Sequence, residues 1–327
     1  MSRPFLPSEP TRALLESHGF KHYYGVENGV GQIDIFERKN RCGIYVLIFR
    51  DGSIYAGLSL DVRKRFAQHR LNHKDIVGFT FVRRSQRELA WREVALINDL
   101  ERHGHRMRNL ALMSVVSGAC KIDELIDPSD LNFWVTGVKL VDASERINDA
   151  ALRQRYLSRF EQFTLLPNSE EIITLLRIYT QNFIPMPRKT ELAFWTSSCL
   201  PSGSTRDVKI CSRINLNMME VATIMVHQGL TQMSFHVAES SLRQELGEDV
   251  SERLIESSFG RWSTHRYKSG GIDQCALFAE TADEAMRMMD DYSFFLSART
   301  MNARLMKKGP CYYSQSHCLS LADRLLE

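Results

Sequence analysis

One stretch decides the fold class: GIYVLIF at residues 43–49, RDGS at 50–53 and IYAG at 54–57. The first and third segments are rich in β-branched and aromatic side chains, which pack well on a pleated sheet. The Asp-Gly pair between them supplies a glycine, the residue that most readily takes the positive φ of a tight turn. The sequence therefore predicts a β-hairpin over residues 43–57.

The residues that follow the hairpin predict a helix, a strand and a second helix. Ser59 is the expected N-cap of a helix over about residues 60–71. The apolar run VGFTFV at 77–82 is the expected third strand, and SQRE at 85–88 is a capping-box pattern that begins a helix running to about residue 102. We therefore expect a small three-stranded sheet with flanking helices.

Both expected helices carry polar residues that could belong to a functional site. Arg65 and His69 are four residues apart and share one helix face, while Val62 and Phe66 form a separate apolar pair. In the second helix, Glu93 stands beside an apolar stripe of Leu89, Ala90, Val94, Ile97 and Leu100. A carboxylate in such a place is either solvated at the margin of the stripe or held for a metal or a proton.

The positive charge of the chain is concentrated in the same region. The net charge of all 327 residues is only +3, yet residues 41–110 carry 14 lysines and arginines against 7 aspartates and glutamates, an excess of +7. A basic segment attracts polyanions through phosphate neutralisation and counterion release. We therefore expect a nucleic acid as partner; a solvated arginine-rich face is the alternative.

The order of these residues along the chain resembles the sequence motif of the GIY-YIG nucleases. The first tripeptide of that family's motif is at residues 43–45 and the second at 55–57, with Ala56 where isoleucine or valine is usual. The further matching residues are Arg65, His69, Glu93 and Asn109. The resemblance covers residues 41–110 and implies a nuclease domain that hydrolyses phosphodiester bonds.

The resemblance implies a catalytic set of Tyr45, Tyr55, Arg65, His69, Glu93 and Asn109. Glu93 would hold a divalent metal, Mg²⁺ or alternatively Mn²⁺, because these hard cations prefer oxygen ligands. Arg65 would neutralise phosphate oxygens, and either Tyr45 or Tyr55 would take the proton of the attacking water. His69 would orient a tyrosine or contact phosphate, and Lys64 would contact the nucleic acid. Each residue also has a structural alternative, such as packing for the tyrosines or an ion pair with Arg92 for Glu93.

The rest of the chain gives weaker signals. Residues 1–40 read as an N-terminal extension, 41–112 as the nuclease domain, 113–187 as a helical connector and 188–327 as a C-terminal α+β domain, so the whole chain is expected to be α+β. The clearest connector helices are expected at 144–163 and 169–183, and further C-terminal helices at about 240–257 and 281–306.

Three further features bear on possible sites. The segment RWSTHRYKSGG at 261–271 alternates basic and aromatic residues, so Arg261, Arg266 and Lys268 are candidate nucleic-acid contacts, with a solvated hairpin turn as the alternative. The pair His103 and His105, and the group Cys311, His317 and Cys318, both lack a full set of zinc ligands. The seven cysteines include no C-x-x-C pair, which favours reduced thiols.

Together these observations predict a metal-dependent DNA endonuclease, acting in restriction or in defence against foreign DNA. The C-terminal half would recognise DNA, or it would sense, self-associate or bind a regulatory partner; its net charge of −2 over residues 196–327 favours the second role. The alternatives are a non-catalytic nucleic-acid-binding protein and a nuclease that acts on RNA. No apolar run is long enough to span a membrane and no secretory signal is present, so we expect a cytoplasmic protein without membrane contact.

Overall fold

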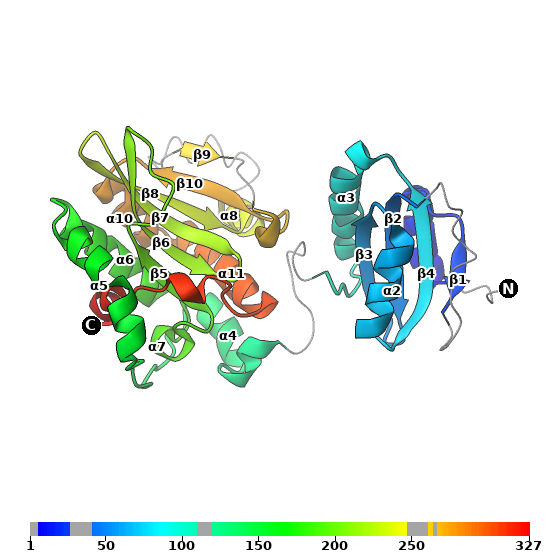
Figure 1. Cartoon of the computed structure of the whole chain (residues 1–327), viewed down its shortest axis with the longest axis horizontal. Coiled ribbons are helices and arrows are strands. Elements are labelled where there is room, and N and C mark those ends of the chain that lie inside the picture. The colour runs from blue at the N-terminus through cyan, green and yellow to red at the C-terminus, as the bar shows by residue number, and fades with distance from the viewer. Residues whose placement is uncertain (1–5, 27–40, 110–119, 247–260, 264–266) are drawn as a thin grey trace. The chain divides into compact units, whose positions relative to one another are not determined.

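The structure is a computed structural model that describes residues 6–26, 41–109, 120–246, 261–263 and 267–327. The chain divides into two compact units, Met1–Ser117 and Gly118–Glu327, which we describe separately (Figure 1). Each unit combines helices with one antiparallel sheet, so the chain has the predicted mixed α+β character. In these described ranges, no helix has the length and apolar character needed to cross a lipid bilayer.

The first unit is a helix-flanked sheet. Its elements are α1 (Glu9–Ser17), β1 (Tyr23–Gly25), β2 (Gly43–Phe49), β3 (Ile54–Ser59), α2 (Val62–Asn72), β4 (Ile76–Arg83), the 3-10 helix η2 (Gln86–Glu88) and α3 (Leu89–Arg102). The hairpin of β2 and β3 forms as predicted, and Gly52 takes a φ of 79° in its turn. Ser85 and Glu88 form the predicted capping box before α3.

The sheet has four strands, in the order β1-β4-β2-β3, rather than the three that we predicted. The additional strand β1 comes from the aromatic stretch of the N-terminal extension and pairs with β4, with Tyr23 opposite Thr80. The Thr80 hydroxyl also donates to the carbonyl of His22, at 2.7 Å. A strand of three residues is too short to produce a recognisable alternation in the sequence, and tertiary pairing with β4 is what makes it a strand.

The two faces of this sheet bury different side chains. On one face, Val62 and Phe66 of α2 pack against Tyr45, Leu47 and Phe49 of β2. On the other face, α1 and α3 pack against Ile44, Val46 and Ile48 of the same strand. Since alternate residues of a strand point to opposite faces, the odd-numbered residues of β2 lie on the face of α2.

Two details of the helices differ from the predictions. The N-cap of α2 is Asp61, whose carboxylate accepts from the backbone amides of Arg63 and Lys64 at 3.1 and 3.3 Å, rather than Ser59. Aspartate is as good an N-cap as serine, so the sequence alone could not choose between them. In α3, the buried residues are Leu89, Leu96, Ile97 and Leu100, whereas Ala90 is exposed and Val94 is partly buried.

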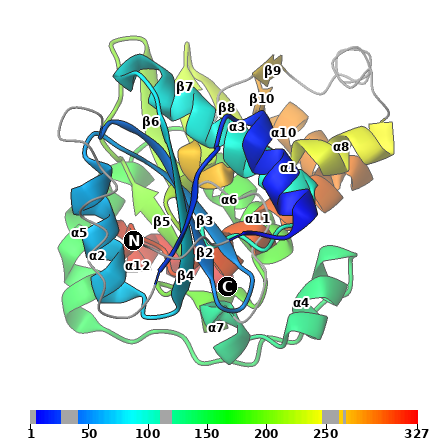
Figure 2. The same cartoon turned by 90° about the vertical axis from the view of Figure 1, so that its right-hand side faces the viewer.

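The second unit is larger. Its helices are η3 (Lys121–Glu124), α4 (Pro128–Val135), α5 (Ala150–Thr164), α6 (Ser169–Phe183), α7 (Pro187–Thr190), α8 (Glu239–Leu246), η4 (Lys268–Gly270), α10 (Ala282–Asp290), α11 (Tyr292–Lys308), η5 (Ser314–Ser316) and α12 (Leu319–Leu326). Its strands are β5 (Trp195–Cys199), β6 (Val208–Leu216), β7 (Met219–His227), β8 (Leu230–Val237), β9 (Arg261–Ser263) and β10 (Cys275–Ala279). Helices α10 and α11 pack against β8 (Figure 1), and α4 and α7 lie at one end of the unit in both views (Figures 1 and 2).

The strands of the second unit form a six-stranded sheet in the order β5-β6-β7-β8-β10-β9. The segment 113–187, which we expected to be a connector, belongs to this unit as far as it is described. Helix α6 packs against α12, and residues such as Ile122, Phe163 and Leu176 share one apolar core with Ile214 and Leu277. The amphipathic pattern of these helices identified an apolar face but could not identify what covers it.

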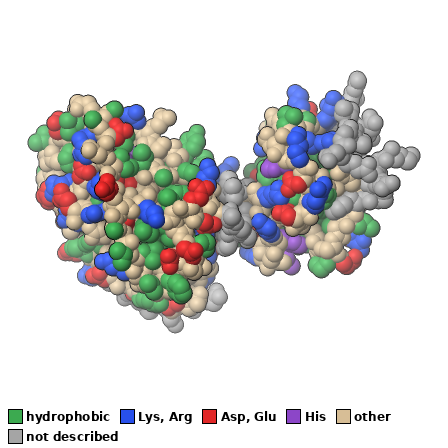
Figure 3. Space-filling view, turned by 90° about the horizontal axis from the view of Figure 1, so that it is seen from below, with side chains coloured by type: hydrophobic (Ala, Val, Ile, Leu, Met, Phe, Trp, Pro, Cys, Tyr) green, Lys and Arg blue, Asp and Glu red, His purple; other side chains and the backbone are tan. Residues whose placement is uncertain are grey.

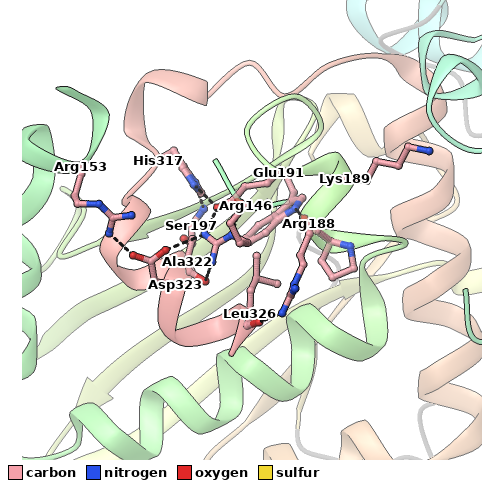
Figure 4. A network of polar contacts seen from close by, with 12 residues as sticks. Arg146, Arg153, Arg188, Lys189, Glu191, Ser197, His317, Ala322, Asp323 and Leu326 are labelled. Atoms are coloured by element: carbon pink, nitrogen blue, oxygen red, sulfur yellow. Dashed lines mark hydrogen bonds and ion pairs between the residues drawn. The ribbon is translucent and has the colours of Figure 1, made fainter. Parts of the chain in front are cut away.

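A buried polar network ties the two ends of the second unit together (Figure 4). The side chain of Glu191 is 0% exposed and accepts two hydrogen bonds from Arg146, at 2.8 and 2.9 Å, and one from Nε2 of His317 at 3.1 Å. Nδ1 of His317 accepts from the backbone amide of Ser197, and Arg146 also pairs with Asp323 of α12. The group of Cys311, His317 and Cys318 is therefore part of the core, and His317 has a structural partner.

Candidate functional site

Two tyrosines of the hairpin lie on the same face of the sheet. Tyr45 of β2 is paired with Gly57 of β3, and Tyr55 of β3 is paired with Leu47 of β2, so the two tyrosines are diagonal neighbours. Their ring centroids are 6.1 Å apart. Tyr45 is 0% exposed, whereas Tyr55 is only partly buried. Tyr55 is therefore the phenol that solvent reaches more easily.

Gly57 provides the space for Tyr45. A Cβ at Gly57 would lie 2.6 Å from the hydroxyl oxygen of Tyr45 and 2.9 Å from a ring carbon of Tyr55. Both distances are below normal van der Waals contact, so any larger residue would displace one of the rings. The glycine at the end of the second tripeptide is thus required by the packing of both tyrosines.

Helix α2 adds His69 and Arg65 to the tyrosine pair. Nε2 of His69 lies 2.8 Å from the hydroxyl oxygen of Tyr45, and the His69 ring centroid is 4.7 Å from that of Tyr55. Nε of Arg65 donates to the same Tyr45 oxygen at 3.4 Å, a long hydrogen bond. The Tyr45 hydroxyl can accept from Arg65 and also share a hydrogen bond with Nε2 of His69. The four side chains form one connected group.

Burial shifts the pKa values of this group. Burial raises the pKa of the Tyr45 phenol well above its ordinary value of 10.0, with the neighbouring Tyr55 adding to the effect and Arg65 opposing it. The pKa of His69 is lowered to about 4, first by burial and then by the charges of Arg65 and His73. Hydrogen bonds to Tyr45 and to Tyr55 raise the pKa of the Arg65 guanidinium. At neutral pH Tyr45 is therefore a neutral phenol, His69 a neutral imidazole and Arg65 a cation.

The other two predicted residues lie along the outer edge of β3, which is an edge strand of the sheet. Oε1 of Glu93 accepts a hydrogen bond from the backbone amide of Leu58 at 2.9 Å. Oδ1 of Asn109 accepts from the amide of Ala56 at 2.8 Å, and its Nδ2 donates to the carbonyl of Ala56. These anchoring points are two residues apart, which is about 7 Å along a strand.

Strand β3 therefore connects the two halves of the predicted site. Tyr55 and Gly57 lie on its face beside Arg65 and His69, while the alternate residues Ala56 and Leu58 present their amides to Asn109 and Glu93. Five residues from other parts of the sequence thus contact the four-residue segment 55–58. The carboxylate of Glu93 has four lone-pair positions, so accepting one amide proton leaves it able to bind a cation.

Metal binding by Glu93 would depend on ligands from outside the protein. Within the described ranges, histidine, cysteine and acidic side chains nowhere gather in a group of three or more that could hold a metal ion. Mg²⁺ does not need such a group, because it commonly binds one or two carboxylates and completes its shell with water and phosphate oxygens. Glu93 fits that kind of site, and it does not fit a closed zinc site.

The residues predicted to contact nucleic acid are divided between the two units. Lys64 is exposed on α2, one residue before Arg65. Lys268 is exposed at the start of η4 in the second unit. Arg261 begins β9, where its backbone pairs with Phe278, and Arg266 lies outside the described residues. Lysine and arginine side chains (blue) are spread over the visible face of the first unit, with histidines (purple) among them (Figure 3).

Sequence reasoning missed one residue of the site, His73. Its ring stacks on that of His69 with centroids 6.0 Å apart, it packs edge-on against Phe49, and it is the C-cap of α2. His73 lies four residues after His69, the same helical spacing that pointed to Arg65 and His69. That spacing could have identified it. Comparison with protein-family models, with curated proteins and with solved structures finds no match to this chain.

Proposed function

We propose that this chain is a metal-dependent endonuclease that hydrolyses phosphodiester bonds of DNA, with a cleavage site of the GIY-YIG type in its first unit. One observation carries the proposal: strand β3 gathers the group of Tyr45, Tyr55, Arg65 and His69 on its face and holds Glu93 and Asn109 at its edge. A phosphodiesterase needs a cation, a metal-binding carboxylate and a route for a proton, and these residues supply all three.

Glu93 is the residue that would hold Mg²⁺ or Mn²⁺. When bound, the metal would neutralise charge on the phosphate and stabilise the departing 3′ oxygen. The hydrogen bond from the Leu58 amide fixes one oxygen of the Glu93 carboxylate at the edge of β3. Asn109 binds both backbone groups of Ala56, so we assign it the role of positioning β3 rather than of touching the substrate.

Arg65 supplies a permanent positive charge for the phosphate. Arg65 is an exposed residue of α2. Its guanidinium donates to the Tyr45 hydroxyl, and its Nη1 donates to Oε1 of Gln68 at 3.2 Å. A guanidinium presents several donors in a plane, which matches the non-bridging oxygens of a phosphate. Because negative charge on these oxygens grows during attack, Arg65 would stabilise the transition state more than the bound substrate.

The tyrosines differ in the part that they can take in proton transfer. Tyr45 is buried, its hydroxyl is already bound to His69 and Arg65, and its raised pKa keeps it a neutral phenol. We therefore assign Tyr45 to positioning, together with His69. Tyr55 is partly exposed, and hydrogen bonding to it contributes to the raised pKa of Arg65. We assign Tyr55 the contact with the attacking water.

The test is cleavage of plasmid DNA by the purified full chain, with Mg²⁺ and with EDTA, alongside single-stranded DNA and RNA. We expect cutting in Mg²⁺ and none in EDTA. Glu93→Gln keeps the volume of the side chain and its amide-accepting oxygen but removes the charge, so cutting should fall by several powers of ten. Binding of DNA, measured in EDTA, should be unchanged or slightly tighter, because an acidic group beside the phosphate is lost.

Glu101→Gln is the matched control, since Glu101 is on the same helix α3, two turns beyond Glu93. It should cut at the rate of the unchanged protein. If Glu93→Gln also cuts at that rate in Mg²⁺, the assignment of the cleavage site is wrong. Binding of DNA without any cutting would instead support the non-catalytic alternative, and cutting of RNA alone would make RNA the substrate.

A further inference from the structure

A second basic feature of the first unit is a cavity of about 500 Å³ at the end of β4, beside the start of α3. It lies outside the group of Tyr45, Tyr55, Arg65 and His69, and it was not identified from the sequence. It is lined by Cys42, Arg83, Arg84, Ser85, Gln86, Glu88 and Arg92. Three arginines against one glutamate leave an excess of positive charge at its wall.

The arginines of the cavity have few carboxylate partners among the described residues. Arg83 is exposed and forms no ion pair with any carboxylate in the part of the chain that the structure describes. Arg92 shares Glu88 at 3.1 Å, but Glu88 also accepts from the Ser85 hydroxyl at 2.7 Å in the capping box. Of the three arginines, Arg92 alone is paired with a carboxylate among the described residues, so the cavity can accept a further negative charge.

Arg84 is held by backbone carbonyls, and no carboxylate of the described residues binds it. Its guanidinium donates to the carbonyls of His18, at 2.8 Å, and of Arg83, at 3.0 Å, and its Nε is buried without a hydrogen-bond partner among the described residues. Gly19, with a φ of 91°, leaves the space for it, since a Cβ there would lie 2.5 Å from the guanidinium. Burial lowers the pKa of Arg84, and the charge of Arg92 lowers it further. An anion between the two guanidiniums would relieve that repulsion.

Both helix α3 and the sheet connect the cavity to the proposed cleavage site over a short distance. Arg92 is the residue before Glu93 on α3. In the sheet, Leu58 binds Glu93, and the next residue, Ser59, pairs with Gly43, which in turn pairs with Arg83. Two strand spacings separate Ser59 from Arg83, about 10 Å. Along a DNA strand that distance covers roughly three phosphates, at 3.4 Å of axis each.

We propose that the cavity lined by Arg83, Arg84 and Arg92 is a subsite for the phosphodiester backbone of DNA beside the cleavage site. This inference rests on the proposed function. The subsite would bind phosphates on one side of the cleaved bond and so fix the position of the strand relative to Glu93 and Arg65. Such contacts set register rather than sequence preference, because every nucleotide carries the same phosphate.

Cys42 makes the cavity directly testable. Cys42 lines the cavity and is only partly buried, whereas five of the other cysteines, Cys199, Cys211, Cys275, Cys311 and Cys318, are buried. The full chain is treated with N-ethylmaleimide in EDTA, and alkylation is followed by mass spectrometry. A duplex oligonucleotide should slow alkylation of Cys42 severalfold, while Cys120, a partly buried cysteine of the second unit, reacts at an unchanged rate.

Variants of the arginines distinguish phosphate binding in the cavity from steric shielding of Cys42 by DNA bound elsewhere. Arg83→Gln and Arg92→Gln should each weaken DNA binding, lower the salt dependence of log K by about 0.9 for each lost contact, and reduce the protection of Cys42. Arg102→Gln is the control, because it removes an exposed charge, 69% exposed, at the far end of the same helix α3. It should leave the protection of Cys42 unchanged.

The outcomes distinguish this inference from the proposed function. If the unchanged protein cuts the duplex in Mg²⁺ but the duplex does not protect Cys42, the subsite is wrong and the endonuclease proposal stands. Protection of Cys42 that is lost in Arg83→Gln, without any cutting by the unchanged protein, would support the subsite and overturn the cleavage proposal. Equal protection by inorganic phosphate and by the duplex, at matched phosphate concentration, would overturn the assignment to a DNA backbone.

Discussion

The hydroxyl oxygen of Tyr45 lies only 2.6 Å from where a Cβ on Gly57 would be, which leaves no room for a methyl group on that residue. The two residues are paired across β2 and β3, so the contact is built into the register of the hairpin. Since Tyr45 also holds His69 and Arg65, the absence of a side chain at Gly57 determines where these two residues lie.

Gly57→Ala should therefore displace Tyr45 and lower the cutting rate more than it lowers stability. Inserting a methylene-sized group into a packed site costs about 1–3 kcal/mol of unfolding free energy. Cutting rate and denaturant unfolding are measured on the same preparation. Gly104→Ala is the control: Gly104 has a φ of 75° but nothing within 4 Å of the added Cβ, so stability should fall while the cutting rate stays unchanged. Equal effects of both variants on cutting would contradict the argument.

Arg65→Lys should separate charge from geometry. Lysine keeps the positive charge but lacks the planar set of donors, and it cannot reproduce the Nε hydrogen bond to Tyr45. We expect the cutting rate to fall by about 10²-fold, the cost of removing one well-placed donor to a developing anion. DNA affinity should change little, since the charge is retained. A lysine variant that cuts normally would show that Arg65 acts as a simple charge.

The pKa of His69 predicts a dependence of stability on pH. Histidine ordinarily has a pKa of 6.5, and in this fold His69 has a pKa of about 4. Between these values the unfolded chain binds a proton that the folded chain does not, so the unfolding free energy should fall as the pH falls from 6.5 towards 4. Above pH 6.5 the full stabilisation is present. Comparing unfolding of the protein with that of His69→Gln across this range isolates the effect; identical slopes would contradict the low pKa.

The buried network of the second unit predicts an effect on stability alone. Glu191→Gln removes a fully buried charge and leaves Arg146 without its bidentate partner, which should cost about 3–5 kcal/mol of unfolding free energy. Glu170→Gln is the matched control, because Glu170 is 72% exposed and its ion pair with Arg324 is worth about 0–1 kcal/mol. The cutting rate of the folded protein should be unchanged in both, since the proposed catalytic residues are all in the first unit.

How far the sequence predicts the fold depends on how local each signal is. The hairpin turn at Asp51 and Gly52 and the capping box at Ser85 follow from neighbouring residues, and both are present in the structure. The strand β1 depends on pairing with β4, which is more than fifty residues away in the sequence, and it was missed. Likewise, the helix expected over 281–306 is interrupted at Asp291, whose carboxylate caps α11 at Ser293 and Phe294.

The candidate site shows the same division. The resemblance to the GIY-YIG nucleases pointed to Tyr45, Tyr55, Arg65 and His69, and strand and helix periodicity is enough to place them on facing surfaces. The hydrogen bonds of Glu93 to Leu58 and of Asn109 to Ala56 depend on how α3 and the segment after it pass the edge of β3. The arginines of the cavity were also missed, because a doublet such as Arg83 and Arg84 carries no periodic signal.

Glu93 and Asn109 also occupy the position where another chain could add a strand. The outer edge of β3 would otherwise present the free amides of Ala56 and Leu58, and exposed edges of this kind promote intermolecular sheet pairing. A short bridge between Ile54 and Met107 covers the next position along. Two residues of the proposed site thus also cover the edge through which the sheet could pair with another chain. Truncating Glu93 to alanine would expose that edge and invite aggregation, whereas glutamine retains the oxygen that covers it.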